Sequence, residues 1–257
     1  MINPPPEGLL LLIGGSFNPP HVAHMRMAFE SLEILQPRQA FFIPCAQPPH
    51  KSGGDLLPFS LRCAMLRAAL KNTAGEHLIG VSEVENERQS PSYTIETLQI
   101  MQSRFPSLRP VFVMGSEDYA RLHTWLRWRE LPALADLAIM PRSPAADESF
   151  ERGSAELWPE AVPILPPCPG VTRALVFPHG GRLLYLPQPV LEISSTLVRE
   201  RYRDGRSLDC LIPDGVLTLM RSNADVLRMA WGGAATGFDN APIRRCEPPC
   251  PGAKNSV

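Results

Sequence analysis

The apolar run Leu9-Leu-Leu-Leu-Ile13 leads directly into Gly14-Gly-Ser-Phe-Asn-Pro-Pro-His-Val-Ala-His24, and this stretch decides the fold. The run predicts a buried strand, and the glycine pair predicts a turn at its carboxyl end. Such a turn leaves backbone amides open to a phosphate, and the helix behind it adds the positive end of its dipole. His21 and His24 lie on one side of the first helical turn. The stretch predicts a phosphate site with two cationic or proton-donating histidines.

Length and charge exclude several classes of function. The chain has 257 residues, enough for one sizeable core, and a formal net charge of −1, which argues against general binding to nucleic acid or to an anionic membrane. No apolar run approaches the roughly 18 residues of a membrane span. The first residues lack the basic region of a signal peptide. The six cysteines favour reduced thiols in the cytoplasm over disulfides or a zinc site.

Apolar and amphipathic segments alternate along the chain. The predicted strands are Leu9–Ile13, Ala40–Pro44, Leu78–Val84, Pro110–Met114, Leu137–Met140 and Arg182–Leu186. The predicted helices are Val22–Leu35, Phe59–Leu70, Thr94–Arg104, Trp125–Ala135 and Ser195–Arg203. This alternation predicts an α/β fold with a doubly wound parallel sheet, in which ligands bind beyond the carboxyl ends of the strands.

The chain divides into one domain and a tail. We expect the domain to cover residues 1–221, with a loose connection over the Pro-, Ala- and Gly-rich residues 143–181. From residue 222 to 257 the composition shifts to Gly, Ala, Pro and Asn without periodicity. That stretch is predicted to be a disordered or poorly packed tail.

Two further motifs follow the early strands. Pro48-Pro-His50-Lys51 comes after the second strand, and its His50 and Lys51 are predicted as a second phosphate contact, with an ordinary surface loop as the alternative. Ser92-Tyr93-Thr94 opens a helix, where Thr94 is either the N-cap or, with Tyr93, a contact to the acceptor substrate.

The remaining motifs lie later in the chain. Gly115-Ser-Glu-Asp118 follows the fourth predicted strand, and of Trp125 and Trp128 we favour Trp125 as a stacking face for an aromatic ring, although both could belong to the core. Ser194-Ser-Thr-Leu-Val-Arg199 places three hydroxyls and a guanidinium at a helix N-terminus, which predicts an anion cradle. The alternative is a simple serine cap with a solvated Arg199.

Taken in order, these five motifs resemble those of bacterial nicotinate-nucleotide adenylyltransferases, within the nucleotidyltransferase superfamily. The resemblance runs from about Leu9 to Leu219, and the first string matches the signature Gly-Gly-x-Phe-Asp/Asn-Pro-x-His-x-Gly/Ala-His. It implies a Rossmann-like nucleotidyltransferase domain that joins ATP to nicotinate mononucleotide, giving deamido-NAD and pyrophosphate in NAD biosynthesis. Ala23 replaces the usual glycine between the histidines.

The resemblance also implies a role for each matching residue. His21, His24 and Arg199 would be catalytic. The ATP phosphates would contact Gly14, Gly15, Ser16, Phe17, His50, Lys51, Ser194, Ser195 and Thr196. The nicotinate nucleotide would contact Tyr93, Thr94, Glu117, Trp125 and Arg142, with Asp118 an alternative to Glu117.

The chemistry expected of this site needs no covalent intermediate. A phosphomonoester with a second pKa of about 6 is already an ionised nucleophile near neutral pH, so no general base is required. Mg²⁺ would be held mainly by the ATP phosphates, with no protein metal site. Three alternatives stay open at this point: another acceptor such as nicotinamide mononucleotide, a non-catalytic nucleotide sensor, and RNA binding, for which the basic and aromatic surface pattern is lacking.

Overall fold

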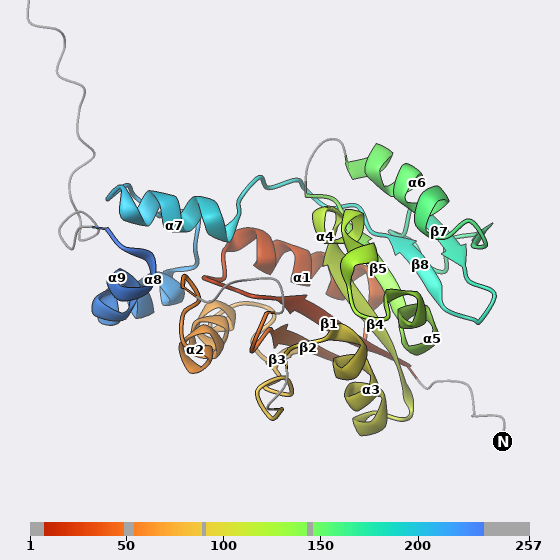
Figure 1. The fold of residues 1–257 in the computed structure, drawn as a ribbon, viewed down its shortest axis with the longest axis horizontal. Coiled ribbons are helices and arrows are strands. Elements are labelled where there is room, and N and C mark those ends of the chain that lie inside the picture. The colour runs from red at the N-terminus through yellow and green to blue at the C-terminus, as the bar shows by residue number, and fades with distance from the viewer. Residues whose placement is uncertain (1–7, 49–53, 89–90, 143–145, 234–257) are drawn as a thin grey trace, which may run out of the picture.

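Eight strands form a single sheet in the order β3-β2-β1-β4-β5-β8-β7-β6 (Figure 1). The computed structural model describes residues 8–48, 54–88, 91–142 and 146–233. The strands are β1 Gly8–Gly15, β2 Gln39–Pro44, β3 Ile79–Val81, β4 Leu108–Gly115, β5 Asp136–Met140, β6 Val162–Ile164, β7 Arg173–Val176 and β8 Arg182–Tyr185. Strands β1 to β5 and β8 run parallel, whereas β6 and β7 pair antiparallel at one edge.

The first strand lies inside the sheet, with β2 on one side and β4 on the other. Helices cover both of its faces, so Leu10, Leu11, Leu12 and Ile13 are all fully buried. This is why the strand reads as an unbroken apolar run rather than as alternating polar and apolar residues.

Two helical layers sandwich the sheet. The helices are α1 Val22–Leu35, α2 Phe59–Leu70, α3 Thr94–Arg104, α4 Ser116–Ala120, α5 Leu131–Leu134, α6 Ala146–Leu157, α7 Ser195–Arg203, α8 Asp214–Ser222 and α9 Ala224–Trp231. Leu11 and Ile13 of β1 share a core with α1, α2, α7, α8 and α9, whereas Leu10 and Leu12 share one with α3, α4, α5 and α6. Among the described helices, none is both long and apolar enough to cross a bilayer.

The strand order reverses between β1 and β4, and in sheets of this kind ligands bind beyond the carboxyl ends of the strands at that point. The loops after β1, β4, β5 and β8 all leave the sheet at this edge. The predicted doubly wound sheet is confirmed, and helices α1, α2, α3 and α7 have the predicted bounds.

The predicted helix Trp125–Ala135 is wrong. Its residues form one 3₁₀ turn, Trp128–Glu130, and the short α5, and a further 3₁₀ turn, Leu122–Thr124, comes just before them. Trp125 is extended, and Arg127 has a left-handed φ of 53°, so the helical pattern is interrupted twice.

The loose connection expected over 143–181 is also wrong for the described residues. Helix α6 and strands β6 and β7 occupy this region. Only one side of α6 is buried, through Ala146, Phe150 and Ser154, and the β6 side chains are exposed, so neither element carries a strong apolar pattern.

The packed part of the chain extends past the expected boundary at residue 221. Helix α9 buries Leu227 and Trp231 in the same core as α1 and α2. The sequence missed this helix because its apolar residues were read as part of a Gly- and Ala-rich tail. The remainder of that tail, from residue 234, lies outside the described residues.

Candidate functional site

Two stacked histidines form the centre of the site at the carboxyl edge of the sheet. The ring centroids of His21 and His24 lie 3.7 Å apart with an interplanar angle of 29°. His21 is the N-cap of α1, and its backbone N–H donates to Nδ1 of His24 at 3.2 Å. Both side chains are buried. The short spacing from the glycine turn therefore places the pair inside the protein, next to residues 14–20, which are called the phosphate loop below after their predicted role.

Burial keeps both imidazoles neutral in the protein without nucleotide. Desolvation, and secondarily the charge of Arg142, lowers the pKa of His21 to about 3. The pKa of His24 is also well below its usual value, because of burial first and then His21 and Arg142. Of the two forms that the sequence predicts, cationic or proton-donating, neutral rings favour the proton-donating one. Since Nδ1 of His24 accepts a hydrogen bond, the neutral ring carries its proton on Nε2 and can donate from there.

Unsatisfied polar atoms distinguish this cluster from a structural one. Nδ1 and Nε2 of His21 and Nε of Arg199 are buried, and none of them has a hydrogen-bond partner among the described residues. Buried polar atoms are normally paired, so such orphans mark a place where a polar ligand completes the bonding. The site is prepared for an acceptor-rich group such as a phosphate.

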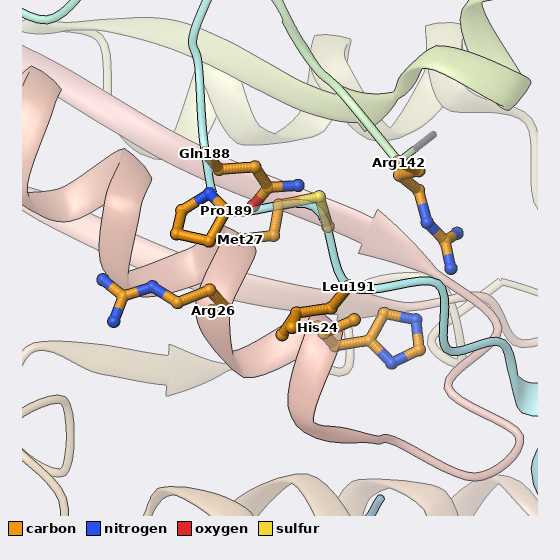
Figure 2. Close-up of a pocket in the computed structure, with 8 residues that line it drawn as sticks. His24, Arg26, Met27, Arg142, Gln188, Pro189 and Leu191 are labelled. Carbon is orange, nitrogen blue, oxygen red and sulfur yellow. The ribbon is translucent and has the colours of Figure 1, made fainter. Parts of the chain in front are cut away.

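Arg142, in the loop after β5, brings a positive charge to the histidines. It lines a small pocket together with His24, and Figure 2 shows its guanidinium on the same side of that pocket as the His24 ring. Nη2 of Arg142 donates to the Ile193 carbonyl at 3.0 Å. The side chain crosses Gly115 so closely that a Cβ there would lie 2.5 Å from its Cδ. The glycine at the end of β4 therefore makes room for the arginine.

Arg142 lies with the histidines and with the segment that leads into α7. Its position also separates the two candidate carboxylates. Glu117 lies 4.0 Å from Arg142, whereas Asp118 pairs with Arg121 of its own turn. Of the two carboxylates, Glu117 is the one next to the site.

The N-terminus of α7 is fastened to the phosphate loop. The Ser194 hydroxyl accepts the Leu197 N–H as an N-cap, and the Ser195 hydroxyl donates to the Pro19 carbonyl at 2.9 Å. Arg199 donates to the carbonyl of Asn18 at 2.9 Å and to the Thr196 hydroxyl at 3.3 Å. A solvated Arg199 is therefore wrong, because this side chain joins α7 to the loop before His21.

The phosphate loop itself is shaped by two phenylalanines. The Phe112 ring covers Gly14, where a Cβ would lie 2.6 Å from the ring. Phe17 is fully buried and packs edge-on against His24, with centroids 4.9 Å apart. The Phe17 side chain thus supports the histidine, and only its backbone remains for a phosphate. Gly15 and Ser16 lie between these two supports.

The residues expected to bind the acceptor lie beside the loop. Trp125 is partly buried and meets Phe112 edge-on at 6.1 Å, so Phe112 connects it to Gly14. Trp128 instead packs against Trp158 at 4.8 Å and is covered by the guanidinium of Arg129. This arrangement favours Trp125 as the stacking face.

The start of α3 has a different function from the predicted cap. Tyr93, not Thr94, is the N-cap, and neither a Tyr93 nor a Thr94 hydroxyl closes the helix end. The Ser92 hydroxyl instead accepts the N–H groups of Ala46 and Gln47, both at 3.0 Å. Ser92 therefore ties Tyr93 and Thr94 to the loop that leads toward His50 and Lys51, which themselves lie outside the described residues.

Sequence reasoning missed two residues that shape the site. The Asn18 side chain donates to the Asp55 carbonyl at 2.7 Å and accepts the Leu57 N–H at 3.0 Å. Arg62 of α2 reaches the Ser16 carbonyl at 2.7 Å. Asn18 stood inside the signature, but Arg62 had no signal, because its partners are 46 and 5 residues away.

The chain is similar to known proteins in sequence and in fold. Residues 12–201 match the family model described as cytidylyltransferase-like. A protein of Maridesulfovibrio salexigens named as a probable nicotinate-nucleotide adenylyltransferase is 30% identical over 221 residues, covering 86% of this chain and 98% of that protein. One of Geobacter sulfurreducens with the same name is 32% identical over 205 residues, covering 80% of this chain and 92% of that protein.

Solved structures show the same fold. A Plasmodium falciparum nicotinic acid mononucleotide adenylyltransferase complexed with NaAD superposes with a TM-score of 0.65 at 18% identity. The superposition covers 84% of this chain and 96% of that one.

Proposed function

We propose that this chain, which belongs to the family of nicotinate-nucleotide adenylyltransferases, transfers the adenylyl group of ATP to nicotinate mononucleotide. The products are deamido-NAD and pyrophosphate, and the reaction belongs to NAD biosynthesis in the cytoplasm. One observation carries the proposal beyond family membership. A neutral, buried histidine pair, in which neither ring nitrogen of His21 has a partner among the described residues, lies with Arg142 and Arg199 at the point where the strand order reverses.

The reaction is a direct displacement at the α-phosphorus of ATP. A phosphate oxygen of nicotinate mononucleotide, ionised near neutral pH, forms the new P–O bond, and the bond to pyrophosphate breaks. No proton has to be removed from the nucleophile. The protein must hold two mutually repelling anions in line and neutralise charge on the reacting oxygens.

Three groups of this chain supply the neutralisation. The Nε2–H of His24 donates to an α-phosphoryl oxygen, and the single N–H of neutral His21 donates to the same triphosphate. Arg142 and Arg199 approach from the loop after β5 and from α7, and take the charge of the departing pyrophosphate. The amides of the loop from Gly14 to Phe17 and the hydroxyls of Ser194, Ser195 and Thr196 complete the cradle.

The other contacts are assigned from their position. Trp125 stacks on the pyridine ring, Tyr93, Thr94 and Glu117 border the acceptor, and His50 and Lys51 contribute phosphate contacts. Mg²⁺ enters with ATP as the substrate complex, since phosphate oxygens and water satisfy its preference for oxygen ligands.

Pyrophosphate release tests the proposal. The protein is given ATP and Mg²⁺ with nicotinate mononucleotide, nicotinamide mononucleotide or phosphopantetheine as acceptor. We expect turnover that strongly prefers the nicotinate nucleotide. A preference for another acceptor would overturn the substrate, and ATP-dependent thermal stabilisation without turnover would indicate a sensor instead of an enzyme.

A further inference from the structure

Arg62 of α2 lies next to the phosphate loop and is not among the residues to which ligand contacts were assigned. Its side chain is completely buried. Nη1 donates to the Ser16 carbonyl at 2.7 Å, and Nε donates to the Leu57 carbonyl at 3.0 Å. The guanidinium also lies 5.4 Å from the centroid of the Phe59 ring. Three separate contacts therefore fix its plane.

No carboxylate of the described residues forms an ion pair with this guanidinium. Its Nη2 is buried without a hydrogen-bond partner in the same ranges. Burial is also the largest effect on its pKa, which lies below the usual value for arginine. Keeping an arginine here is unfavourable unless the loop carbonyl that it binds matters.

The Ser16 carbonyl belongs to the peptide that also carries the Phe17 N–H. In a trans peptide the C=O and N–H bonds point in opposite directions. When Arg62 holds the carbonyl toward α2, the Phe17 N–H must face away from α2. That N–H donates no hydrogen bond to any described residue.

The backbone at Phe17 resists this orientation. Its φ is +47°, in the left-handed region that residues other than glycine seldom adopt. Rotating the Ser16–Phe17 peptide by about half a turn would return φ to the ordinary negative region. The same rotation would aim the Ser16 carbonyl, instead of the Phe17 N–H, at the phosphate site. The relaxed peptide would repel the ligand.

We propose that Arg62 is a positioning residue for adenylyl transfer: it holds the Ser16–Phe17 peptide in its strained orientation so that the Phe17 N–H donates to a phosphate oxygen of ATP. This inference rests on the proposed function. Leu57 makes this arrangement more rigid, because its carbonyl accepts a hydrogen bond from Arg62 while its N–H donates one to the Asn18 side chain. The two backbone groups of Leu57 thus connect Arg62 of α2 to Asn18 of the loop.

Three variants of Arg62 separate charge, hydrogen bonding and shape. Arg62→Met keeps much of the side-chain volume but has neither charge nor hydrogen-bond donor. Arg62→Gln keeps one neutral donor group, and Arg62→Lys keeps the charge without the planar set of N–H donors of a guanidinium. We expect Arg62→Met to lower kcat/KM for ATP about 100-fold, the effect of losing one preorganised donor, with the acceptor KM changed less than threefold. Arg62→Gln and Arg62→Lys should lie between this variant and the wild type.

Leu66→Ala is the matched control, because Leu66 is a fully buried residue of the same helix whose apolar side chain cannot hydrogen-bond to the loop. It should lower the melting temperature and leave both KM values unchanged. A similar kinetic loss in Leu66→Ala, or wild-type kinetics in a folded Arg62→Met, would overturn the inference. If Arg62→Met does not fold, Arg62→Gln decides by the same criterion.

Two binding measurements keep this inference separate from the proposed function. If the wild type does not turn over nicotinate mononucleotide, the proposed function fails, but titration calorimetry with ATP still reports on the loop. We expect a weaker ATP Kd in Arg62→Met than in Leu66→Ala. In ¹⁵N-labelled protein, the Phe17 amide signal should shift on ATP addition in the wild type and not in Arg62→Met. An equal shift in both proteins would contradict the role of Arg62.

Discussion

Two buried polar clusters occupy opposite edges of the same parallel sheet, and they differ in how well they are satisfied. At the amino edge, Asp136 begins β5 and is fully buried. Its Oδ1 accepts from Nε and Nη2 of Arg109 and from the Arg182 backbone, and its Oδ2 accepts from Nε and Nη2 of Arg182. At the carboxyl edge, both ring nitrogens of His21 and Nε of Arg199 are buried without partners among the described residues, beside His24 and Arg142.

The difference shows what each cluster is for. A buried carboxylate with every acceptor position filled stabilises the fold and has nothing left for a ligand. A buried imidazole with both nitrogens unpaired destabilises the protein alone and gains its partners only when a ligand binds. Polar satisfaction thus separates the structural cluster from the functional one, and the two should respond oppositely to mutation.

His24→Ala should give the largest effect. Removing the Nε2–H donor is expected to lower kcat by about 10² to 10³-fold, the usual loss for a preorganised donor, while the melting temperature stays close to that of the wild type. Steady-state pyrophosphate release and a circular-dichroism melt measure the two quantities.

His24→Asn sharpens this test. Its side-chain oxygen can replace Nδ1 as the acceptor of the His21 N–H, but it leaves no donor at the position of Nε2. We expect it to be as inactive as His24→Ala. Recovery of activity in His24→Asn would assign His24 to capping the helix and remove it from the reaction.

Asp136→Asn, at the amino edge of the sheet, should lower stability and leave activity unchanged. The amide cannot accept all five hydrogen bonds and carries no charge for the two arginines, so the free energy of unfolding should fall by about 3 kcal/mol. Well below the melting temperature, kcat and both KM values should match the wild type. Urea denaturation and steady-state kinetics on one preparation measure these quantities. A selective rise in the KM of either substrate would contradict a purely structural role for Asp136.

The pH dependence of stability probes the histidines directly. The folded-state pKa of His21 is about 3 and the unfolded value is 6.5, so the unfolded chain binds more protons between these limits. Stability is therefore complete above about pH 6.5 and is lost as the pH falls. At pH 5, about 1.5 units below the unfolded pKa, His21 alone accounts for a loss of about 2 kcal/mol.

Urea denaturation at pH 7.5 and pH 5 measures this loss. His21→Asn, which cannot titrate, should show a smaller difference between the two pH values. An identical difference in wild type and His21→Asn would mean that His21 is not held neutral.

The same two clusters explain what the sequence could predict. The glycine turn, His21, His24 and the helix they begin are local in the chain, so residue spacing was enough to predict them. Asp136 lies 27 residues from Arg109 and 46 from Arg182, and nothing local indicates that these three meet. Arg62 reaches Ser16 across 46 residues for the same reason.

The sequence pattern also gave wrong secondary-structure predictions where local backbone geometry outweighs composition. The tryptophan-rich segment after Trp125 was expected to be a helix, but the left-handed Arg127 breaks it. Helix α6 has little apolar surface and was expected to be a loop. The neutral state of the histidines could not be predicted either, because it depends on how deeply the fold buries them.

Trp231→Phe gives the smallest expected effect and tests the comparison where the two edges are hardest to tell apart. Trp231 of α9 lies at the functional edge, yet it is satisfied: its Nε1–H donates to the Asp55 carbonyl at 2.8 Å. That carbonyl also accepts from Asn18, so the substitution removes one hydrogen bond without leaving a buried orphan. Phenylalanine keeps an aromatic ring against Tyr202. The free energy of unfolding should fall by about 1 kcal/mol, with kcat and the ATP KM within twofold of the wild type.

The kinetic result decides whether complete hydrogen bonding or proximity to the phosphate loop determines the role of a residue. If polar satisfaction identifies structural residues, Trp231 should behave like Asp136 even though it shares an acceptor with the residue whose carbonyl binds Arg199. If proximity to the phosphate loop is what matters, the ATP KM should rise several-fold while stability hardly changes. Circular-dichroism denaturation measures the loss of stability, and ATP-dependent kinetics on the same variant measure the loss of affinity. Together they distinguish the two explanations.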